Sequence, residues 1–192
     1  MRLNLAAVAL FLAPLGACTT IERFNAPALE GTPATSALVV VRVEATNRGI
    51  NDSKSLQVVV GGTLQRIDDA TRIEGRAAAG YIVFSGVAPG EYRLINVLTI
   101  WNNGTYVINH RYPVPLDSSR AYDLTLRSGE PCYLGVVAIE DVTTLSERGV
   151  YFDLKDVANG EMRAWSWFAG IYAASPWAEV ARRGPSEACT RR

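Results

Sequence analysis

Histidine is almost missing from this sequence, which contains a single one, His110, among 192 residues. A catalytic triad needs a histidine close to a serine or cysteine nucleophile. His110 follows a predicted strand among polar residues, where a surface or structural role is the better interpretation. Ser85 precedes Gly86 but lacks a glycine two residues before it, so there is no nucleophile elbow. The sequence therefore contains no convincing catalytic set.

Clusters of metal ligands are also lacking. Zinc sites use several closely spaced His or Cys residues, and the three cysteines of this chain lie far apart. The adjacent carboxylates Asp68-Asp69 and Glu140-Asp141 belong to no calcium-loop motif, and on a strand the two members of a pair point to opposite faces. We therefore predict no metal and no cofactor.

Neither an excess of charge nor a long apolar run is present. Lys+Arg and Asp+Glu number 19 each, and no stretch concentrates basic residues, which argues against a nucleic-acid partner. The N-terminal apolar stretch from Leu5 to Leu15 has only about half of the roughly 20 residues that a transmembrane helix needs. An ordinary membrane-spanning anchor is therefore excluded for this stretch.

The first residues have the order of features found in a secretory signal. Arg2 provides a positive charge, and an apolar run from Leu5 to Leu12 follows it. The next residues, Leu15-Gly16-Ala17-Cys18, resemble the lipobox of bacterial lipoproteins, in which an apolar residue and two small residues precede a cysteine. The resemblance implies that Cys18 receives a diacylglycerol, that the chain is cut before it, and that the new amino group is acylated.

By this resemblance, residues 1–17 form the signal peptide and Cys18 is the first residue of the mature protein. Two or three acyl chains, palmitate among them, hold a protein stably on a membrane, whereas one chain does so only marginally. Thr19 stands where an aspartate would retain an enteric lipoprotein in the inner membrane, which favours the periplasmic face of the outer membrane. The inner membrane and the cell surface stay open, because sorting rules differ among bacteria. An ordinary cleavage site beside an unmodified cysteine is the other interpretation.

Acylation of Cys18 would leave Cys132 and Cys189 as an even pair in an oxidising compartment, where disulfides form. A bridge between them would tie the C-terminal tail to a strand in the middle of the chain. Two unpaired thiols are the alternative, because Cys189 lies among polar residues at the end of the sequence.

Short β-branched runs separated by turn residues occupy residues 37–158, which predicts an antiparallel β-sandwich. Residues 18–36 before them are polar and interrupted by Pro27 and Pro33, a composition typical of a flexible tether. The first run, 38–43, places alternate valines on one face. Further strands are predicted at 81–84, 92–101, 105–108, 122–126, 133–139 and 150–154.

Glycines mark two predicted turns. Gly61-Gly62 separates the apolar runs 56–60 and 63–67, and two glycines accept the positive φ angles of a two-residue hairpin turn. A flexible glycine loop between unpaired segments is the alternative. Pro89 and Gly90 occupy the central positions of a predicted type II turn. Residues 68–79 fit either a short helix or an exposed connection.

The segment from Gly80 to Leu94, GYIVFSGVAPGEYRL, resembles the signature of transthyretin-like, or carboxypeptidase regulatory-like, domains. That signature is a strand, an apolar residue, a Pro-Gly turn and then Tyr-x-Leu. The chain as a whole resembles uncharacterised bacterial lipoproteins built on this sandwich. The resemblance implies a mainly β, immunoglobulin-like or transthyretin-like fold rather than an activity, because one fold supports many functions.

The C-terminal part, residues 159–192, is predicted to be a helical cap and tail. Trp165, Phe168 and Tyr172 recur at helical spacing, and Ser175-Pro176 has the residue types of an N-cap and a first helical position for a shorter helix through residue 183. Trp165 and Phe168 fit a core role in such a cap.

Two tryptophans are candidate contacts with a partner or ligand. Trp167 lies off the core face of the predicted helix by roughly 100° to 200°, so we expect an exposed indole that forms a partner-facing patch, with Trp177 beside it. A core role in a helix that closes over the sandwich is the alternative interpretation. Tryptophan offers flat apolar area and an N–H donor to a protein or a sugar.

The sequence thus predicts a non-enzymatic, membrane-anchored periplasmic lipoprotein with a binding or structural role in the cell envelope, where an envelope protein or a glycan is the candidate partner. A carbohydrate-binding or weakly hydrolytic envelope protein is the alternative, because carboxylates from distant segments can meet in space. Carboxylates beside an aromatic cleft would favour the alternative, and a flat apolar patch around Trp167 would favour a protein partner.

Overall fold

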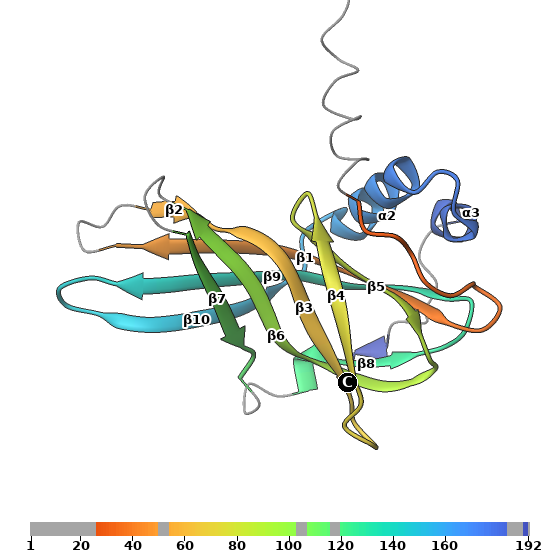
Figure 1. Cartoon of the computed structure of the whole chain (residues 1–192), viewed down its shortest axis with the longest axis horizontal. Coiled ribbons are helices and arrows are strands. Elements are labelled where there is room, and N and C mark those ends of the chain that lie inside the picture. The colour runs from red at the N-terminus through yellow and green to blue at the C-terminus, as the bar shows by residue number, and fades with distance from the viewer. Residues whose placement is uncertain (1–25, 50–53, 103–106, 116–119, 184–189, 192) are drawn as a thin grey trace, which may run out of the picture.

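The computed structural model describes residues 26–49, 54–102, 107–115, 120–183 and 190–191 (Figure 1). These residues are mainly β, with two short helices near the C-terminal end, so the predicted fold class is confirmed at this level. The elements are β1 (Ala37–Arg48), β2 (Lys54–Leu56), β3 (Val58–Arg66), β4 (Arg72–Ala78), β5 (Tyr81–Val87), β6 (Gly90–Asn102), β7 (Val107–Pro113), the 3-10 helix η1 (Arg120–Tyr122), β8 (Asp123–Leu126), β9 (Pro131–Thr143), β10 (Arg148–Lys155), α2 (Gly160–Ile171), α3 (Pro176–Arg182) and β11 (Thr190–Arg191).

All the strands belong to one sheet that curls until it is nearly barrel-shaped (Figure 1). The order is β10-β9-β1-β5-β4-β3-β6-β8-β11, with β2 added beside β1 and β7 beside β6. The sheet is mixed, because β1 and β9 pair in parallel along Leu38 to Arg48, whereas the other pairs are antiparallel. The prediction of a purely antiparallel arrangement is therefore wrong at this pair, and the architecture is not clearly an immunoglobulin-like sandwich.

Two hydrophobic cores lie on opposite faces of β1. Val39, Val41 and Val43 point into the interior of the curled sheet, as the alternation predicts, and join its large core. Leu38 and Val40 point outward and are covered by the helices in a second core. All five side chains are at most 3% exposed. The first part of β1, from Ala37 to Val41, is therefore buried on both faces, which explains its unbroken apolar run.

The two helices form where the sequence predicts them. In α2 the side chains of Trp165 and Phe168 face the sheet and Tyr172 follows them at the C-cap, all three packed in the second core. Helix α3 begins after Ser175, whose Oγ accepts a hydrogen bond of 3.2 Å from the backbone N–H of Trp177. The predicted N-cap is confirmed.

Gly61 and Gly62 do not form a hairpin turn, so this prediction is wrong. Both lie inside β3, which pairs with β4 and β6, and their φ angles fall outside the left-handed region. A Cβ atom at Gly61 would lie 2.5 Å from the carbonyl oxygen of Gly75 in β4. The pairing with β6 also shifts register between Val59 and Gly61. The glycines therefore allow a β-bulge in β3 and a close approach of the β3 and β4 backbones.

The remaining predicted strands agree with observed ones, with boundaries that differ, and residues 105–106 of the predicted strand 105–108 lie outside the described residues. Residues 68–79, which the sequence left open, contain β4. The predicted turn at Pro89 and Gly90 lies at the connection between β5 and β6, where Gly90 is the first residue of β6 and has a φ of 151°.

Part of the predicted tether, residues 26–36, packs on the domain. Ala26 and Leu29 contact the second core, and the backbone N–H of Glu30 donates to Ser85 Oγ at 2.8 Å. These residues therefore follow the surface of the sheet. Among the described residues, no helix combines the length and the apolar character needed to cross a membrane.

Candidate functional site

The sheet opens where β1 and β3 diverge. Pairing of β1 with β5 ends at Arg42 and pairing with β2 begins at Thr46, while pairing of β3 with β4 begins only at Gly61. An isolated backbone hydrogen bond of 2.9 Å lies at each end of the opening. One runs from Val43 N–H to Gly80 O, and the other from Gln57 N–H to Ala45 O. Between them, in the described part of the chain, residues 43–45 and 58–60 have strand partners on only one side.

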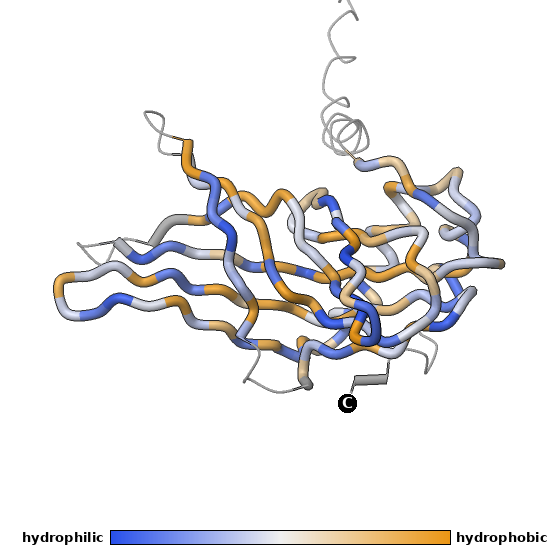
Figure 2. Tube along the Cα trace, turned by 60° about the horizontal axis from the view of Figure 1, so that its bottom comes forward, coloured by the Kyte–Doolittle hydropathy of each residue, from blue (hydrophilic) through white to orange (hydrophobic). Residues whose placement is uncertain are grey.

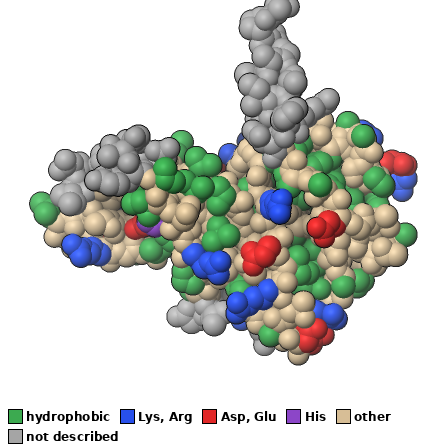
Figure 3. All heavy atoms as spheres, in the orientation of Figure 1, with side chains coloured by type: hydrophobic (Ala, Val, Ile, Leu, Met, Phe, Trp, Pro, Cys, Tyr) green, Lys and Arg blue, Asp and Glu red, His purple; other side chains and the backbone are tan. Residues whose placement is uncertain are grey.

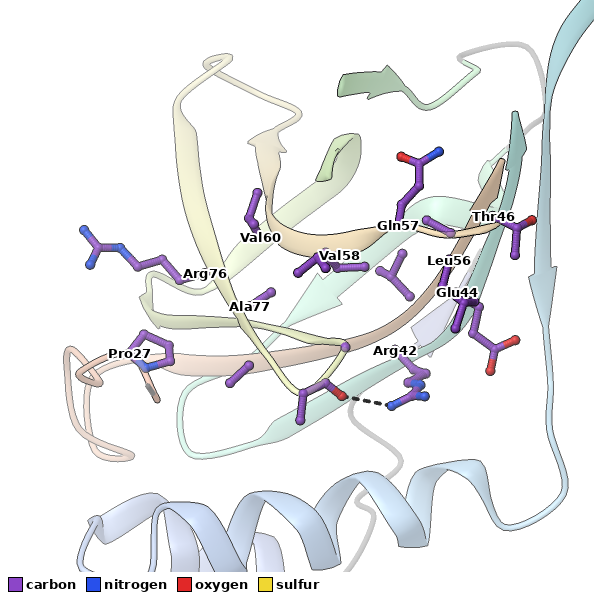
Figure 4. A pocket seen from close by; sticks show the side chains of 16 residues that line it. Pro27, Arg42, Glu44, Thr46, Leu56, Gln57, Val58, Val60, Arg76 and Ala77 are labelled. Atoms are coloured by element: carbon purple, nitrogen blue, oxygen red, sulfur yellow. Dashed lines mark hydrogen bonds between the residues drawn. The ribbon is translucent and has the colours of Figure 1, made fainter. Parts of the chain in front are cut away.

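A groove of about 880 Å³ occupies this opening (Figure 4). Along one wall Leu56, Val58 and Val60 are 81%, 63% and 38% exposed. They alternate with Gln57 and Val59, whose side chains belong to the interior. The opposite wall includes alanines 77–79. The groove is therefore aliphatic, with no aromatic ring among its lining residues.

Charged side chains stand at the rim of the groove. The Arg42 Nη1 atom donates to the carbonyl oxygen of Ala79 at 3.1 Å, and its guanidinium lies 4.9 Å from the centre of the Tyr81 ring. Arg76 and Glu44 also line the groove and are exposed (Figure 4). Glu44 is the one carboxylate among the lining residues, so this groove does not hold a pair of acids.

The apolar wall continues across the neighbouring strands. Val58 pairs with Ile100 of β6, Gly61 pairs with Leu98, and Asn102 at the end of β6 pairs with Val107 of β7. Directly paired residues share a face of the sheet. Val107 is 64% exposed, and Leu98 and Ile100 are half-buried. Figure 3 shows hydrophobic side chains gathered over β3 and β6. We call this surface the outer apolar patch: Leu56, Val58, Val60, Leu98, Ile100 and Val107.

Behind the wall, the interior holds a hydrogen-bonded polar cluster. Gln57 Nε2 donates to the Tyr112 hydroxyl at 2.7 Å, and that hydroxyl donates to Asp141 Oδ2 at 2.8 Å. The Thr99 hydroxyl donates to Gln57 Oε1. Burial raises the pKa of Tyr112 to about 12. Because every member has a partner, the cluster stabilises this end of the interior.

His110 and the acidic pair Glu140-Asp141 contact neighbouring side chains. The His110 ring stacks on Tyr112 with 5.6 Å between centroids and 3° between planes. Asp141 bonds Tyr112, whereas Glu140 lies 3.5 Å from Arg48, so this pair contacts different partners. Among the described residues, no three His, Cys, Asp or Glu side chains gather as a metal site would require.

The tryptophans singled out by sequence do not line the groove. The Trp167 ring stacks on Tyr81 with 4.3 Å between centroids and is half-buried. Trp177 is fully buried in the second core, so its side chain does not reach a partner-facing surface. The two indole N–H groups and the Tyr172 hydroxyl have no hydrogen-bond partner in the described structure. Burial raises the pKa of Tyr172 to about 12.

Cys132 lies in the interior core, is 1% exposed and is disulfide-bonded. Cys18 and Cys189 lie outside the described residues, so lipidation of the first and pairing of the second with Cys132 stay predictions. Next to Cys189, the short strand β11 pairs with β8, with Thr190 opposite Thr125.

Sequence reasoning missed the groove and the outer apolar patch. The available signal was the alternation of Leu56, Val58 and Val60, which we interpreted as one strand of a hairpin. Recognising an exposed apolar face also requires knowing which other segments cover it, and none of the described ones covers this face.

Comparison with known proteins yields no relative: no protein-family model matches the chain, and no curated protein or solved structure matches it significantly.

Proposed function

We propose that this chain is a lipid-anchored envelope protein with a non-enzymatic binding role, held on the periplasmic face of a bacterial outer membrane through acyl chains on Cys18. The groove between β1 and β3 is its binding site. The lipobox residues Leu15 to Cys18 support the anchor, and the groove supports the role.

The aliphatic character of the groove is the observation that carries this proposal. Leu56 and Val58 expose most of their side chains, although burying such side chains would stabilise the chain by about 1.5 to 3 kcal/mol each. Exposed apolar surface of this kind marks interaction sites. A sugar site would instead use aromatic faces and carboxylates, and Glu44 is the one carboxylate among the lining residues.

We also propose that the fold is a modified transthyretin-like sandwich. The support is the Pro-Gly connection between β5 and β6, two strands that do not pair with each other. Strand β5 lies between β1 and β4, and β6 lies between β3 and β8. The connection thus passes from one side of the curled sheet to the other, as a connection between two sheets does.

The anchor is tested by mass spectrometry of the protein purified from bacterial membranes. We expect an N-terminal peptide that begins at Cys18 and carries a diacylglycerol and an amide-linked acyl chain. The Cys18→Ser variant should lose the lipid mass and leave the membrane fraction. A mature chain that begins elsewhere, or an unmodified Cys18, would refute the anchor.

The binding site is tested with the hydrophobic dye 1-anilinonaphthalene-8-sulfonate, whose fluorescence rises in apolar sites. We expect dye binding that the Val58→Asp substitution abolishes and that Leu145→Asp, a matched change at a side chain 91% exposed in the β9–β10 turn, leaves intact. Equal binding by the two variants would contradict a site in this groove.

A further inference from the structure

The outer apolar patch is bordered by more positive than negative charge. Arg42 and Arg76 line the groove on one side of the patch, and Arg111, which is exposed, pairs with Leu98 of the patch. Glu44 is the acidic residue among the described lining residues. Glu74, which is exposed, lies two positions before Arg76 on the same face of β4. Three arginines against two glutamates leave a small positive excess, which complements an anionic surface.

The predicted anchor begins close to the same surface. Pro27 lines the groove, and nine residue steps separate it from Cys18. A chain of nine steps extends at most about 30 Å, so an acylated Cys18 holds the groove within that distance of the lipid headgroups. In Figure 1 the start of the described chain lies toward the upper edge of the molecule, as do β2 and the end of β6, and in Figure 2 the start of the described chain again lies toward the upper edge.

The helices leave this part of the sheet uncovered. Helices α2 and α3 pack over the outer side chains of β1, β5 and β9, including Leu38, Val83 and Tyr133. The outer side chains of β2, β3, β6 and β7 have no such layer in the described structure, and Leu56, Val58 and Val107 remain mostly exposed.

We propose that the outer apolar patch docks on the surface of an anionic phospholipid bilayer. Leu56, Val58 and Val107 enter the boundary between headgroups and acyl chains, and the arginines contact lipid phosphates. This docking deepens the proposed function, because it names the partner that the groove wall formed by Leu56, Val58 and Val60 meets together with the rest of the patch. It rests on the proposed anchor for its geometry. The anchor supplies the high local concentration, and the patch sets the orientation of the domain.

The test uses the chain from residue 18 onward with Cys18→Ser, so that no acyl chain contributes to binding. Cosedimentation is measured with vesicles of phosphatidylglycerol and phosphatidylethanolamine at low salt. We expect binding that Leu56→Asp/Val58→Asp weakens at least tenfold, because the change removes two apolar contacts and adds two negative charges. The control Leu145→Asp should change it by less than twofold.

A second pair of variants tests the charges. Arg76→Gln/Arg111→Gln should weaken binding to the same vesicles by about twentyfold or more, since each arginine near an anionic surface contributes about fivefold. Arg148→Gln, an exposed position at the start of β10, should leave binding within twofold. Vesicles of phosphatidylethanolamine alone should bind the unsubstituted chain much less.

A labelled cysteine reports insertion directly. Val58→Cys carrying a nitrobenzoxadiazole dye should shift its emission to the blue when anionic vesicles are added, whereas Leu145→Cys with the same dye should not. Far-UV circular dichroism of each variant shows that the fold is retained. No binding to anionic vesicles, or equal binding by Leu56→Asp/Val58→Asp and Leu145→Asp, would overturn the docking.

The result is separable from that of the proposed function. An acylated Cys18 together with no vesicle binding by the unacylated chain would reject the docking and leave the anchor standing. Patch-dependent vesicle binding with an unmodified Cys18 would reject the anchor instead. Emission of the Val58→Cys dye that shifts only with a soluble protein partner would also reject the docking.

Discussion

Replacing Gly61 by alanine should destabilise the protein strongly, because this position lies inside β3 against the backbone of β4. The added Cβ would lie 2.5 Å from the carbonyl oxygen of Gly75, closer than a carbon and an oxygen can pack. The atom it meets belongs to a paired strand rather than to a mobile side chain, so relief requires that β3 and β4 separate locally.

Overpacking of this kind lowers the free energy of unfolding by about 1 to 3 kcal/mol. Because the added Cβ of Gly61→Ala contacts backbone, we expect a value near the upper end, about 3 kcal/mol. For a domain of this size, that corresponds to a decrease in Tm of about 6 to 12 °C. The assay is urea unfolding followed by circular dichroism, with the midpoint and slope compared between variants.

Gly170→Ala is the matched control, since it makes the same chemical change in the last turn of α2. A Cβ there meets nothing within 4 Å, and alanine favours a helix over glycine by up to about 1 kcal/mol. We therefore expect opposite signs for the two substitutions. A Gly61→Ala variant within about 0.5 kcal/mol of the parent would refute the close approach of β3 and β4.

Three further predictions concern a cap, two hydroxyl groups and the disulfide. Ser175→Ala should cost about 1 kcal/mol in urea unfolding, because α3 loses its N-cap. Tyr112→Phe should cost about 1 to 3 kcal/mol by leaving buried polar groups without a partner, whereas Tyr172→Phe should be nearly neutral. Both phenols have a pKa raised from 10.0 to about 12 in the folded protein. The stability that the protonated phenols contribute is therefore complete below pH 10 and is lost as the pH rises toward 12. The parent protein should lose stability in that window, and the variant with Phe at both positions should lose less. Reduction should lower the free energy of unfolding by about 4 kcal/mol, and peptide mapping without reductant should recover Cys132 joined to Cys189.

Local signals in the sequence were sufficient for much of the fold. The alternation of valines in β1 correctly predicted its interior face, and Ser175-Pro176 correctly predicted the start of α3. Such features depend on neighbours within a few residues, which the sequence displays directly.

Features that depend on distant segments could not be predicted in this way. Strand β1 pairs in parallel with β9, and Leu38 lies opposite Pro131, some ninety residues later. Gly61 was interpreted as a turn residue because nothing near it in the chain reveals the carbonyl of Gly75. Trp167 was expected to be exposed, yet Tyr81 of β5 stacks on its ring.

The candidate site also depends on distant segments, because its exposure is decided by which elements cover each strand. Strands β1 and β3 both carry apolar side chains on their outer faces. Over β1 the helices bury Leu38 and Val40 completely, whereas Val58 of β3 stays 63% exposed. The two helices come from residues 160–182, at the far end of the sequence, and they extend over only one half of the curled sheet. An exposed apolar face of this kind marks an interaction site, and the proposed anchor would place a bilayer within reach of it.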